Sequence, residues 1–340
     1  MKSNAFDFMA EIQPCSLLKV ARAAGVAAST ASLALRGSPL VKAMTTARVR
    51  EAAARLGYRP DPRVGSLMAR IRRARPMKDR ERLAFVWVSA TRADTRREFF
   101  AKVTFAGASR RAAELGCALE EFWLHDDGMT AARLEKILVT RGITGVVFSA
   151  PLRDMEVTVE WNWARFASAI IGNSEFHPSL HRAGHYHYRS MWMAMGKLRV
   201  AGCQRPAVIL HEPHHRRIHG VHQAAFVANH PLPRQALAMA RFGLPETDAE
   251  ARAWFAKIRA DALIFVVNPT EEKLRMLQAL QELRHIVTLG GRKEGLPGID
   301  MREDLIAASA VDLVVAQLHR NERGVPGHPT TLLLEGEWRE

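Results

Sequence analysis

From about residue 16, apolar residues recur three or four positions apart, which is the spacing along one face of an amphipathic helix. The stretch SLLKVARAAG predicts a first helix that has Ser16 as its N-cap and ends at Gly25. A second helix is expected from about Ala28 to Leu35, and TTARVREAAARLGY predicts a third that stops at Gly57. Three short helices with a tight glycine turn between the first two predict a helix-turn-helix unit.

A fourth short helix is expected after this unit. Asp61 and Pro62 form a cap and first-turn signal for the stretch DPRVGSLMARIRRAR. Gly65 inside this stretch costs about 1 kcal/mol relative to alanine, so we expect the helix to be marginal when alone.

After Arg82 the pattern changes to short continuous apolar runs that alternate with helical stretches. The runs LAFVWVS, CALEEFWL, ITGVVFSAP, SAIIGN, RPAVILH, ADALIFVVN and HIVTLGG are typical of buried strands. Stretches such as FFAKVTFAGASRRAAELG, MWMAMGKLRVAG and EEKLRMLQALQEL predict helices between them. Alternating strands and helices imply parallel sheets, and the 258 residues after Arg82 favour two α/β lobes over one.

Composition narrows the class of protein. The chain has 340 residues, 48% of them hydrophobic, but no apolar run near the length of a membrane span, so no membrane role is expected. The first residues, MKSNAFDFMAEIQPCS, lack the pattern of a signal peptide. The three cysteines, Cys15, Cys117 and Cys203, lie far apart, which suits reduced thiols. We therefore expect a cytoplasmic protein.

The positive charge is concentrated at the N-terminal end. Residues 1–82 hold 17 of the 49 basic and 6 of the 35 acidic residues, a net charge of +11, whereas residues 83–340 carry only +3 of the total of +14. Lysine and arginine near phosphates gain affinity by releasing counterions, so this asymmetry favours a head that binds a polyanion. The alternative is a solvated basic tail.

Taken together, these residues resemble the LacI/GalR family of bacterial transcription regulators over nearly the whole chain. The resemblance is carried by VARAAGVAASTASLALRGSP, which ends at Pro39, by the GYRP corner after the third helix, and by Ser66 and Leu67. It implies an N-terminal all-α helix-turn-helix head with a hinge helix, followed by an α/β two-lobed body with parallel sheets, similar to type I periplasmic binding proteins.

The resemblance also implies a domain order and partners. The expected domains are a helix-turn-helix DNA-binding domain at 1–60, a hinge helix and linker at 61–82, and an effector-binding and dimerisation domain at 83–340; within the last, lobe 1 is expected at about 83–172 plus 287–308, and lobe 2 at about 173–286 plus 309–340. The expected partners are a pseudo-palindromic double-stranded DNA operator, a second copy in a homodimer, and a small-molecule effector, of which carbohydrates are the most frequent class in the family. A repressor is expected.

Three kinds of DNA contact are implied by the resemblance: base-facing side chains on the second helix, hydroxyl, basic and tyrosine side chains near the backbone phosphates, and a hinge leucine that wedges into the central base step. The base-facing positions are Ala28, Ser29 and Leu33, the backbone contacts are Lys19, Arg22, Thr30, Ser32, Arg36, Arg48 and Tyr58, and the wedge is Leu67. The alternative is a solvated face for each charge and simple helix packing for Leu67. Alanine and leucine cannot make bidentate hydrogen bonds to bases, so few direct base contacts are expected.

Several positions depart from the family pattern. Ala27 stands where a serine usually caps the recognition helix, a loss of about 1 kcal/mol, and Gly65 replaces the usual hinge arginine. In the body, Pro269 and the pair Gly291 and Arg292 stand where many members have aspartates that hold the effector.

The effector is expected in the cleft between the lobes, where strand C-termini converge. By the resemblance, Arg217 in RIHG and Asn268 at the end of ADALIFVVN are the candidate effector-binding residues. The alternative for Arg217 is a surface arginine at a helix end. The tryptophans Trp87, Trp161 and Trp163 could stack on a sugar, but their apolar neighbours favour core packing.

One stretch of the body suggests an enzyme instead. HEPHH provides His211, Glu212 and His215 in the H-E-x-x-H spacing of zinc hydrolases, but Pro213 in a helix interior would cost about 3 kcal/mol, so we expect the two histidines not to be helical neighbours. A loop rich in exposed histidine is the plainer interpretation. No phosphate-binding or dinucleotide motif and no nucleophile elbow is present. We therefore expect no enzyme activity, cofactor or metal; the alternatives are a solute-binding protein without a DNA role and, last, a zinc hydrolase.

Overall fold

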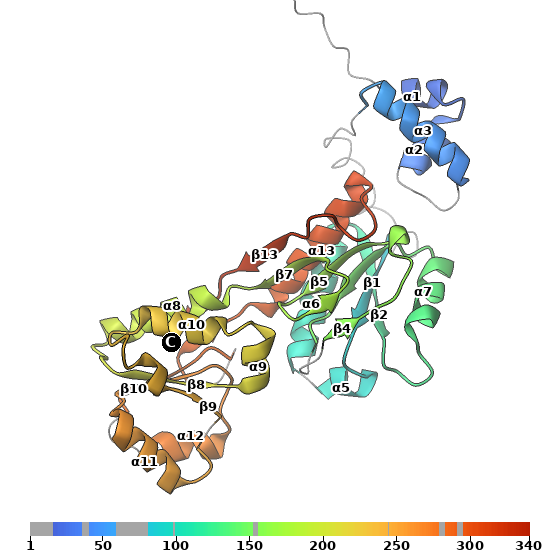
Figure 1. Ribbon diagram of the computed structural model, residues 1–340. Helices are drawn as coiled ribbons and strands as arrows, with labels where there is room; N and C mark the ends of the chain where they lie inside the picture. Colours follow the sequence, from blue (N-terminus) through green and yellow to red (C-terminus); the bar gives the residue numbers. More distant parts are fainter. Residues whose placement is uncertain are drawn as a thin grey trace, which may run out of the picture.

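The computed structural model describes residues 16–35, 41–58, 81–97, 99–151, 156–243, 245–278, 283–290 and 295–340. They form a small helical head and two α/β lobes (Figure 1). The predicted hinge helix with Gly65 and Leu67 lies outside the described residues, as do Arg36, Gly291 and Arg292.

The head consists of three helices, α1 (Leu17–Ala23), α2 (Ala28–Leu35) and α3 (Ala43–Arg55). Ser16 is the N-cap of α1 as predicted, because its hydroxyl accepts the backbone N–H of Lys19 at 3.4 Å. Gly25 has φ +61°, the left-handed conformation that allows the tight turn after α1. Small side chains let the three helices pack closely around one core, which consists of Val20, Ala21, Ala24, Ala31, Ala34, Val49, Ala52 and Ala53.

Lobe 1 is built on a parallel sheet of six strands in the order β13-β7-β5-β3-β1-β2. The strands are β1 (Glu81–Trp87), β2 (Cys117–Trp123), β3 (Gly145–Phe148), β5 (Ala167–Ile171), β7 (His181–His185) and β13 (Thr331–Leu334). The lobe also contains α5 (Arg92–Arg97), α6 (Phe99–Glu114), α7 (Ala131–Thr140), α13 (Glu303–Arg320), the turn η2 (Trp163–Arg165) and a small ladder of β4 (Val157–Thr158) and β6 (Phe176–His177).

Helices cover both faces of this sheet, with α6 and α13 on one face and α7 on the other (Figure 1). That arrangement explains the continuous apolar runs, since a strand buried on two faces needs no polar alternation. Trp87 and Trp161 are 1% and 8% exposed and belong to these cores, and Trp163 packs against them, so core packing is confirmed for the three tryptophans.

Lobe 2 is a second six-stranded sheet in the order β14-β12-β11-β10-β8-β9, parallel except for β14. Its strands are β8 (Pro206–Leu210), β9 (Ala240–Phe242), β10 (Ala262–Phe265), β11 (His285–Thr288), β12 (Gly298–Asp300) and β14 (Glu337–Arg339). Its helices are α8 (His187–Val200), α9 (Glu212–Arg217), α10 (Val221–Asn229), η3 (Ala236–Met239), α11 (Asp248–Ile258) and α12 (Glu271–Gln278). The parallel sheets predicted from the alternating pattern are thus present in both lobes.

The chain passes between the two sheets at three described places, from β7 into α8, from β12 into α13 and from β13 into β14. The predicted division of the chain between the two lobes is therefore wrong in part. Residues 287–300 were assigned to lobe 1, but β11 and β12 pair within the second sheet. Residues 173–286 and 309–340 were assigned to lobe 2, but β7 and β13 pair within the first sheet and α13 packs on lobe 1 beside α6.

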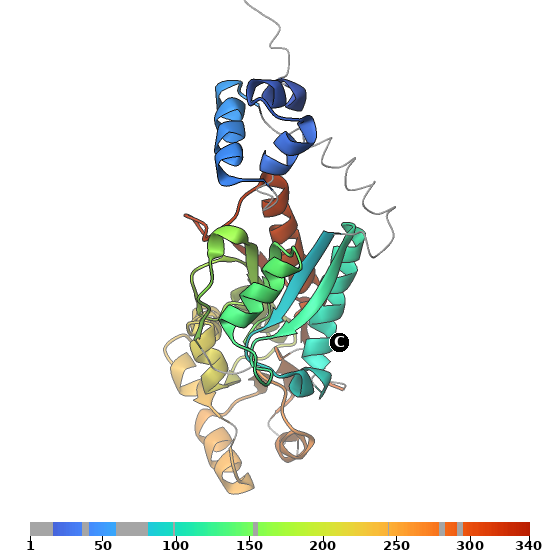
Figure 2. The ribbon, with the colours of Figure 1, turned by 90° about the vertical axis from the view of Figure 1, so that its right-hand side faces the viewer.

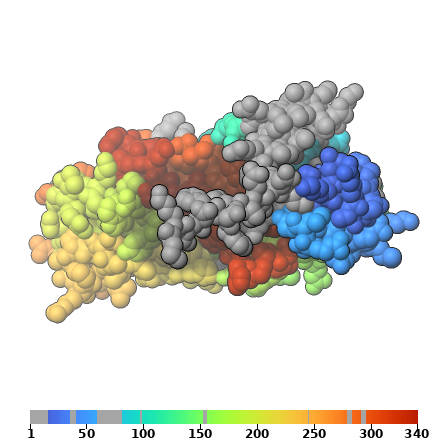
Figure 3. Space-filling view, turned by 90° about the horizontal axis from the view of Figure 1, so that it is seen from above, coloured from blue at the N-terminus to red at the C-terminus, as the bar shows by residue number. Residues whose placement is uncertain are grey.

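Figure 2 shows the parts in sequence along the molecule, with the head beyond the end of lobe 1 that is farther from lobe 2. From above, α1–α3 and lobe 2 lie at opposite ends (Figure 3). None of the helices in the described part of the chain is long and apolar enough to cross a membrane.

Candidate nucleic-acid interface and inter-lobe cavity

The second helix of the head divides its residues between the core and the surface. Ala31 and Ala34 are fully buried, whereas Ser29 is exposed. The remaining predicted contacts on α2 are half-buried; they are Ala28, Thr30, Ser32 and Leu33. The outward face of α2 therefore consists of small, hydroxyl and apolar side chains, with no amide or guanidinium among its described residues.

Basic residues frame this helix from the other two. Lys19 and Arg22 are exposed on α1, and Arg48 is exposed on α3. Tyr58 follows α3, is half-buried and packs against the head core. The positions are compatible with phosphate contacts, which depend on long exposed cations. The DNA roles of these residues stay predictions.

Ala27 precedes α2 and cannot cap it with a side chain. The N–H of Ala31 donates to the carbonyl of Ala27 at 2.9 Å, which is a backbone hydrogen bond of the first turn. A serine or aspartate oxygen at this position usually accepts one of the free N–H groups at a helix start. The start of α2 is thus less firmly held than the start of α1.

A cavity of about 260 Å³ lies between the two lobes. It is placed where β3, β5 and β7 end, and where the chain crosses from β7 into α8 and from β12 into α13. The carboxyl ends of parallel strands are the usual position of a ligand site in α/β folds. Its lining residues are Phe100, Ala150, Pro151, Ile171, Gly172, Asn173, Ser174, His185, His187, His214, Arg217, Ile218, Met301, Glu303 and Ile306.

Of the two predicted effector-binding residues, only Arg217 lines this cavity. Its guanidinium donates to the carbonyl of Pro151 at 3.3 Å and lies 3.4 Å from Nδ1 of His214, so it joins lobe 2 to the backbone of lobe 1. Asn268 does not line the cavity. Its amide donates to the Gly290 carbonyl at 3.1 Å and accepts the Thr288 hydroxyl at 2.8 Å, so it holds two loops of lobe 2 together.

A glycine positions another side chain of the cavity. Asn173 follows β5 and donates its amide N–H to the carbonyl of His185 at 3.1 Å. A Cβ on Gly184 would overlap the amide oxygen of Asn173. Only a glycine at position 184 therefore lets Asn173 lie against β7 in the cavity wall.

Four histidines gather beside the cavity: His185, His187 and His214 line it, and His222 is buried against His187 and His214. The ring centroids of His187 lie 4.9 Å from His185, 4.9 Å from His222 and 5.3 Å from His214. His222 and His214 are stacked at 5.4 Å. One ring nitrogen of each of His187, His214 and His222 lies within 4.8 Å of the other two. This cluster is not apparent in the sequence, because its members come from β7, α8, α9 and α10.

Burial sets the protonation state of these rings. His222 is 1% exposed and His187 8%, and burial lowers the pKa of both well below the usual 6.5. Burial, with Arg217 as a smaller cause, lowers the pKa of His214 to about 4, and burial lowers that of His185 to about 4. All four rings are therefore neutral at neutral pH.

The stretch HEPHH is helical, which corrects two predictions. His211 is the N-cap of α9, Pro213 lies in the first turn, and the backbone N–H of His215 donates to the His211 carbonyl at 2.8 Å. Proline in a first turn has no helical hydrogen bond to break, so His211 and His215 are helical neighbours after all. The stretch is also not an exposed histidine loop, since His214 faces the cavity. Among the described residues, the possible metal ligands that lie close together are His187, His214 and His222, and this group does not include His211 or His215.

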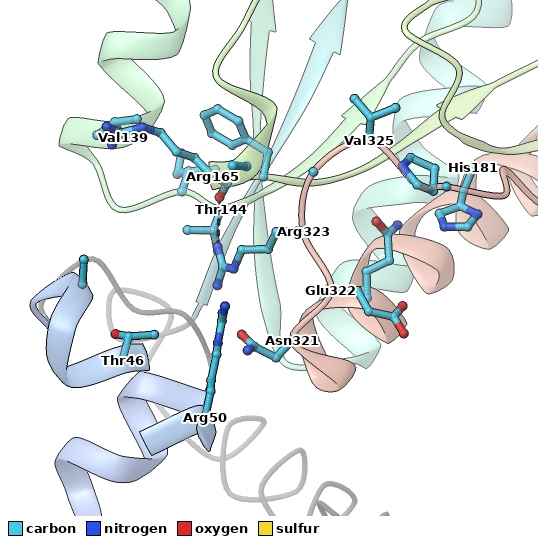
Figure 4. A pocket seen from close by; sticks show the side chains of 18 of the residues that line it. Thr46, Arg50, Val139, Thr144, Arg165, His181, Asn321, Glu322, Arg323 and Val325 are labelled. Carbon is cyan, nitrogen blue, oxygen red and sulfur yellow. Dashed lines mark hydrogen bonds between the residues drawn. The ribbon is translucent and has the colours of Figure 1, made fainter. Parts of the chain in front are cut away.

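A larger hollow, of about 1160 Å³, lies where α3 of the head faces the far end of lobe 1 (Figure 4). Arg50 on α3 and Arg323 after α13 extend toward each other across it (Figure 4). Burial, with Arg50 as a smaller cause, lowers the pKa of the Arg323 guanidinium. Because residues of both the head and lobe 1 line this hollow, it marks the junction between the head and the body.

Comparison with known proteins identifies relatives of the head and of the overall fold. Residues 16–61 match the family model described as bacterial regulatory proteins, lacI family. No curated protein matches the chain. Among solved structures, the transcriptional regulator CelR in complex with cellobiose and the lac repressor dimer bound to operator and the anti-inducer ONPF each align with a TM-score of 0.52 at 17% identity, over 96% of this chain and 98% of theirs. A periplasmic binding protein/LacI transcriptional regulator from Alkaliphilus metalliredigens QYMF, complexed with D-xylulofuranose, aligns at 0.50 and 14% identity over 76% of this chain and 97% of its own. At these identities the likeness concerns the fold.

Proposed function

We infer that this chain is a transcription regulator of the LacI family, which binds DNA through its head and a small-molecule effector between its lobes. The observation that carries the proposal is the head itself: residues 16–61 match the family model, and the described residues among them form three helices around their own core. The charge of residues 1–82, at +11, supplies the electrostatic attraction that such a head needs.

We propose that two copies bind one pseudo-palindromic operator as a homodimer, with α2 of each copy in a major groove and Leu67 in the minor groove between them. The lac repressor dimer bound to operator, whose fold this chain shares, supports the arrangement. Because α2 offers methyl and hydroxyl groups rather than amides, we expect it to contribute few base-specific hydrogen bonds. The kinked centre under Leu67 and the shape of the DNA then supply much of the specificity.

The proposed effector site is the 260 Å³ cavity between the lobes. An effector there touches both lobes, so it can bind one inter-lobe arrangement more tightly than another and shift the position of the heads. Two of the neighbouring folds hold carbohydrates, cellobiose and D-xylulofuranose, which supports a carbohydrate as the first class to test. A cytoplasmic repressor without catalytic activity is the function we propose for the whole chain.

The proposal is tested by selecting bound sequences from random DNA with the full chain. A two-fold symmetric site is expected, and recovery of asymmetric sites only would contradict the dimer. Arg22→Ala should weaken binding to all DNA sequences alike. It should also reduce, by about one, the slope of the logarithm of the binding constant against the logarithm of the salt concentration. Arg234→Ala removes the same charge from an exposed position in lobe 2 and should leave both quantities unchanged.

The central wedge has its own test on the selected site. Leu67→Ala should weaken operator binding and reduce the bend of the DNA, measured by the migration of circularly permuted fragments. An unchanged bend would show that Leu67 does not intercalate. A ligand panel scored for loss or gain of operator binding then identifies the effector and the sign of its action.

A further inference from the structure

The histidine cluster has a feature that packing alone does not explain. Both ring nitrogens of His222, and Nδ1 of His187, are buried without a hydrogen-bond partner among the described residues. A neutral imidazole has one donor and one acceptor, and burying either unpaired is unfavourable. Buried histidines with bonded nitrogens also occur in this protein: His230 donates from Nε2 to the Pro206 carbonyl and accepts the Leu232 N–H at Nδ1. His222 and His187 therefore offer three buried ring nitrogens that no described residue uses.

The donor set has the chemistry of one kind of ligand. Three neutral imidazoles without thiolate or carboxylate suit Zn²⁺ and related divalent transition metals rather than Mg²⁺ or Ca²⁺. A tetrahedral ion with Zn–N bonds of 2.0–2.1 Å separates its ligand atoms by about 3.4 Å. The nitrogens of His187, His214 and His222 already lie within 4.8 Å of one another, so ring rotations that shorten these separations by up to about 1.4 Å would complete the site.

We propose that His187, His214 and His222 bind a divalent transition-metal ion, with Zn²⁺ as the probe, in the wall of the inter-lobe cavity. Three protein ligands leave a fourth position open. Because His187 and His214 line the cavity, that position faces it and can accept an oxygen atom of a bound effector. The metal site stands on the cluster itself; only its use by the effector rests on the proposed function.

Charged side chains near the three histidines link metal binding to the contact between the lobes. Arg217 lies 3.4 Å from Nδ1 of His214 and donates to Pro151 of lobe 1. A cation bound at His214 repels this guanidinium, whereas Glu303 across the cavity is an acidic residue that can offset the added charge. Metal binding is therefore linked to the contact that Arg217 makes between the lobes, and the ion acts as a regulatory ligand together with the effector.

The experiment uses the full chain, freed of metal with a chelator and titrated with Zn²⁺ by calorimetry in the absence of DNA. One Zn²⁺ per chain is expected. Titration with Co²⁺ should give the intense visible ligand-field absorption of a four-coordinate ion with nitrogen ligands. No saturable binding by the folded chain would overturn the proposal.

Variants decide which histidines hold the ion. His187→Ala and His214→Ala should each lower the Zn²⁺ affinity by at least about 100-fold, since even the loss of an outer-shell partner costs 10–100-fold. The matched control is His125→Ala, which removes an exposed histidine of lobe 1 that lies outside the cluster. Equal losses in the control and the cluster variants, or several weak sites, would show adventitious surface binding and overturn the proposal.

Two further readouts keep the result interpretable. His222→Leu removes a ligand but also two unpartnered polar atoms, so it should fold at least as stably as the parent without metal and bind no Zn²⁺; retention of the stoichiometric site would overturn the assignment. DNA binding is scored separately. A chain that binds Zn²⁺ but no DNA refutes the regulator and keeps the site, and one that binds DNA but no Zn²⁺ refutes only the site.

Discussion

His222→Leu is expected to make the metal-free protein more stable, although the residue is 1% exposed in the core of lobe 2. A buried polar group without a partner costs about 1–3 kcal/mol, and His222 has two such nitrogens. Leucine has a similar volume, so overpacking should cost less than about 1.5 kcal/mol. The ring contacts with His187 and His214, at 4.9 and 5.4 Å, are lost and subtract about 1 kcal/mol more. We expect a net gain of about 1–3 kcal/mol.

The assay is thermal unfolding of the full chain with and without Zn²⁺. For a lobe of this size, 1 kcal/mol corresponds to a shift of about 2–4 °C, so the metal-free variant should melt about 2–12 °C above the parent. Zn²⁺ at about 100 times its dissociation constant should stabilise the parent by about 2.7 kcal/mol and leave the variant unchanged. The gap between the two proteins should therefore close or reverse when metal is added.

The control lies on the same helix, four residues further on. Phe226 is fully buried in α10 and has no polar atom to relieve, so Phe226→Leu should lower the melting temperature with and without Zn²⁺ by an amount that corresponds to roughly 1 kcal/mol. If His222→Leu behaves like Phe226→Leu in the metal-free protein, the ring of His222 is an ordinary packing group, and the reasoning from its unpartnered nitrogens is refuted.

Three other outcomes are expected. Below about pH 6.5 the free energy of unfolding should fall, because burial lowers the pKa of His230 and the unfolded chain takes up the proton first; urea titrations at several pH values should show a shallower fall in His230→Gln. Gly184→Ala should destabilise the chain by about 1–3 kcal/mol through its collision with Asn173, and Asn173→Ala should relieve most of that loss in a double-mutant cycle; additive losses would place the strain elsewhere. Leu33→Arg should sharpen sequence preference on the selected operator pool, whereas unchanged preference would show that α2 does not face the bases.

The fold was largely predictable because its signals are local. Ser16 as a cap, the glycine turn at Gly25 and the apolar runs of β1, β8 and β10 each depend on neighbouring residues, and each was placed within a few positions. The exchange between the lobes was not predictable in the same way. Helix α13 is buried from several sides, so its apolar pattern does not indicate which sheet it covers.

The candidate site was likewise predictable only where its signals are local in the sequence. Arg217 was found because its motif is contiguous, whereas His187 and His222 are separated by 35 positions and become neighbours only when α8 and α10 pack together. The error at Pro213 has a different origin. The cost of proline in a helix applies where a backbone hydrogen bond is lost, and the first turn of α9 has none to lose.

The position of the cavity constrains how any ligand there could act on the head. A ligand shifts an equilibrium only by its difference in affinity between two arrangements, so it must touch something that changes when the lobes move. Among the described residues beside the cavity, Arg217 contacts Pro151 and His219 contacts Glu175, and both contacts join the lobes. Both begin in the segment that contains α9, next to His214. A cation or an effector at this wall therefore acts on the inter-lobe contacts directly, and no relay through the core of either lobe is required.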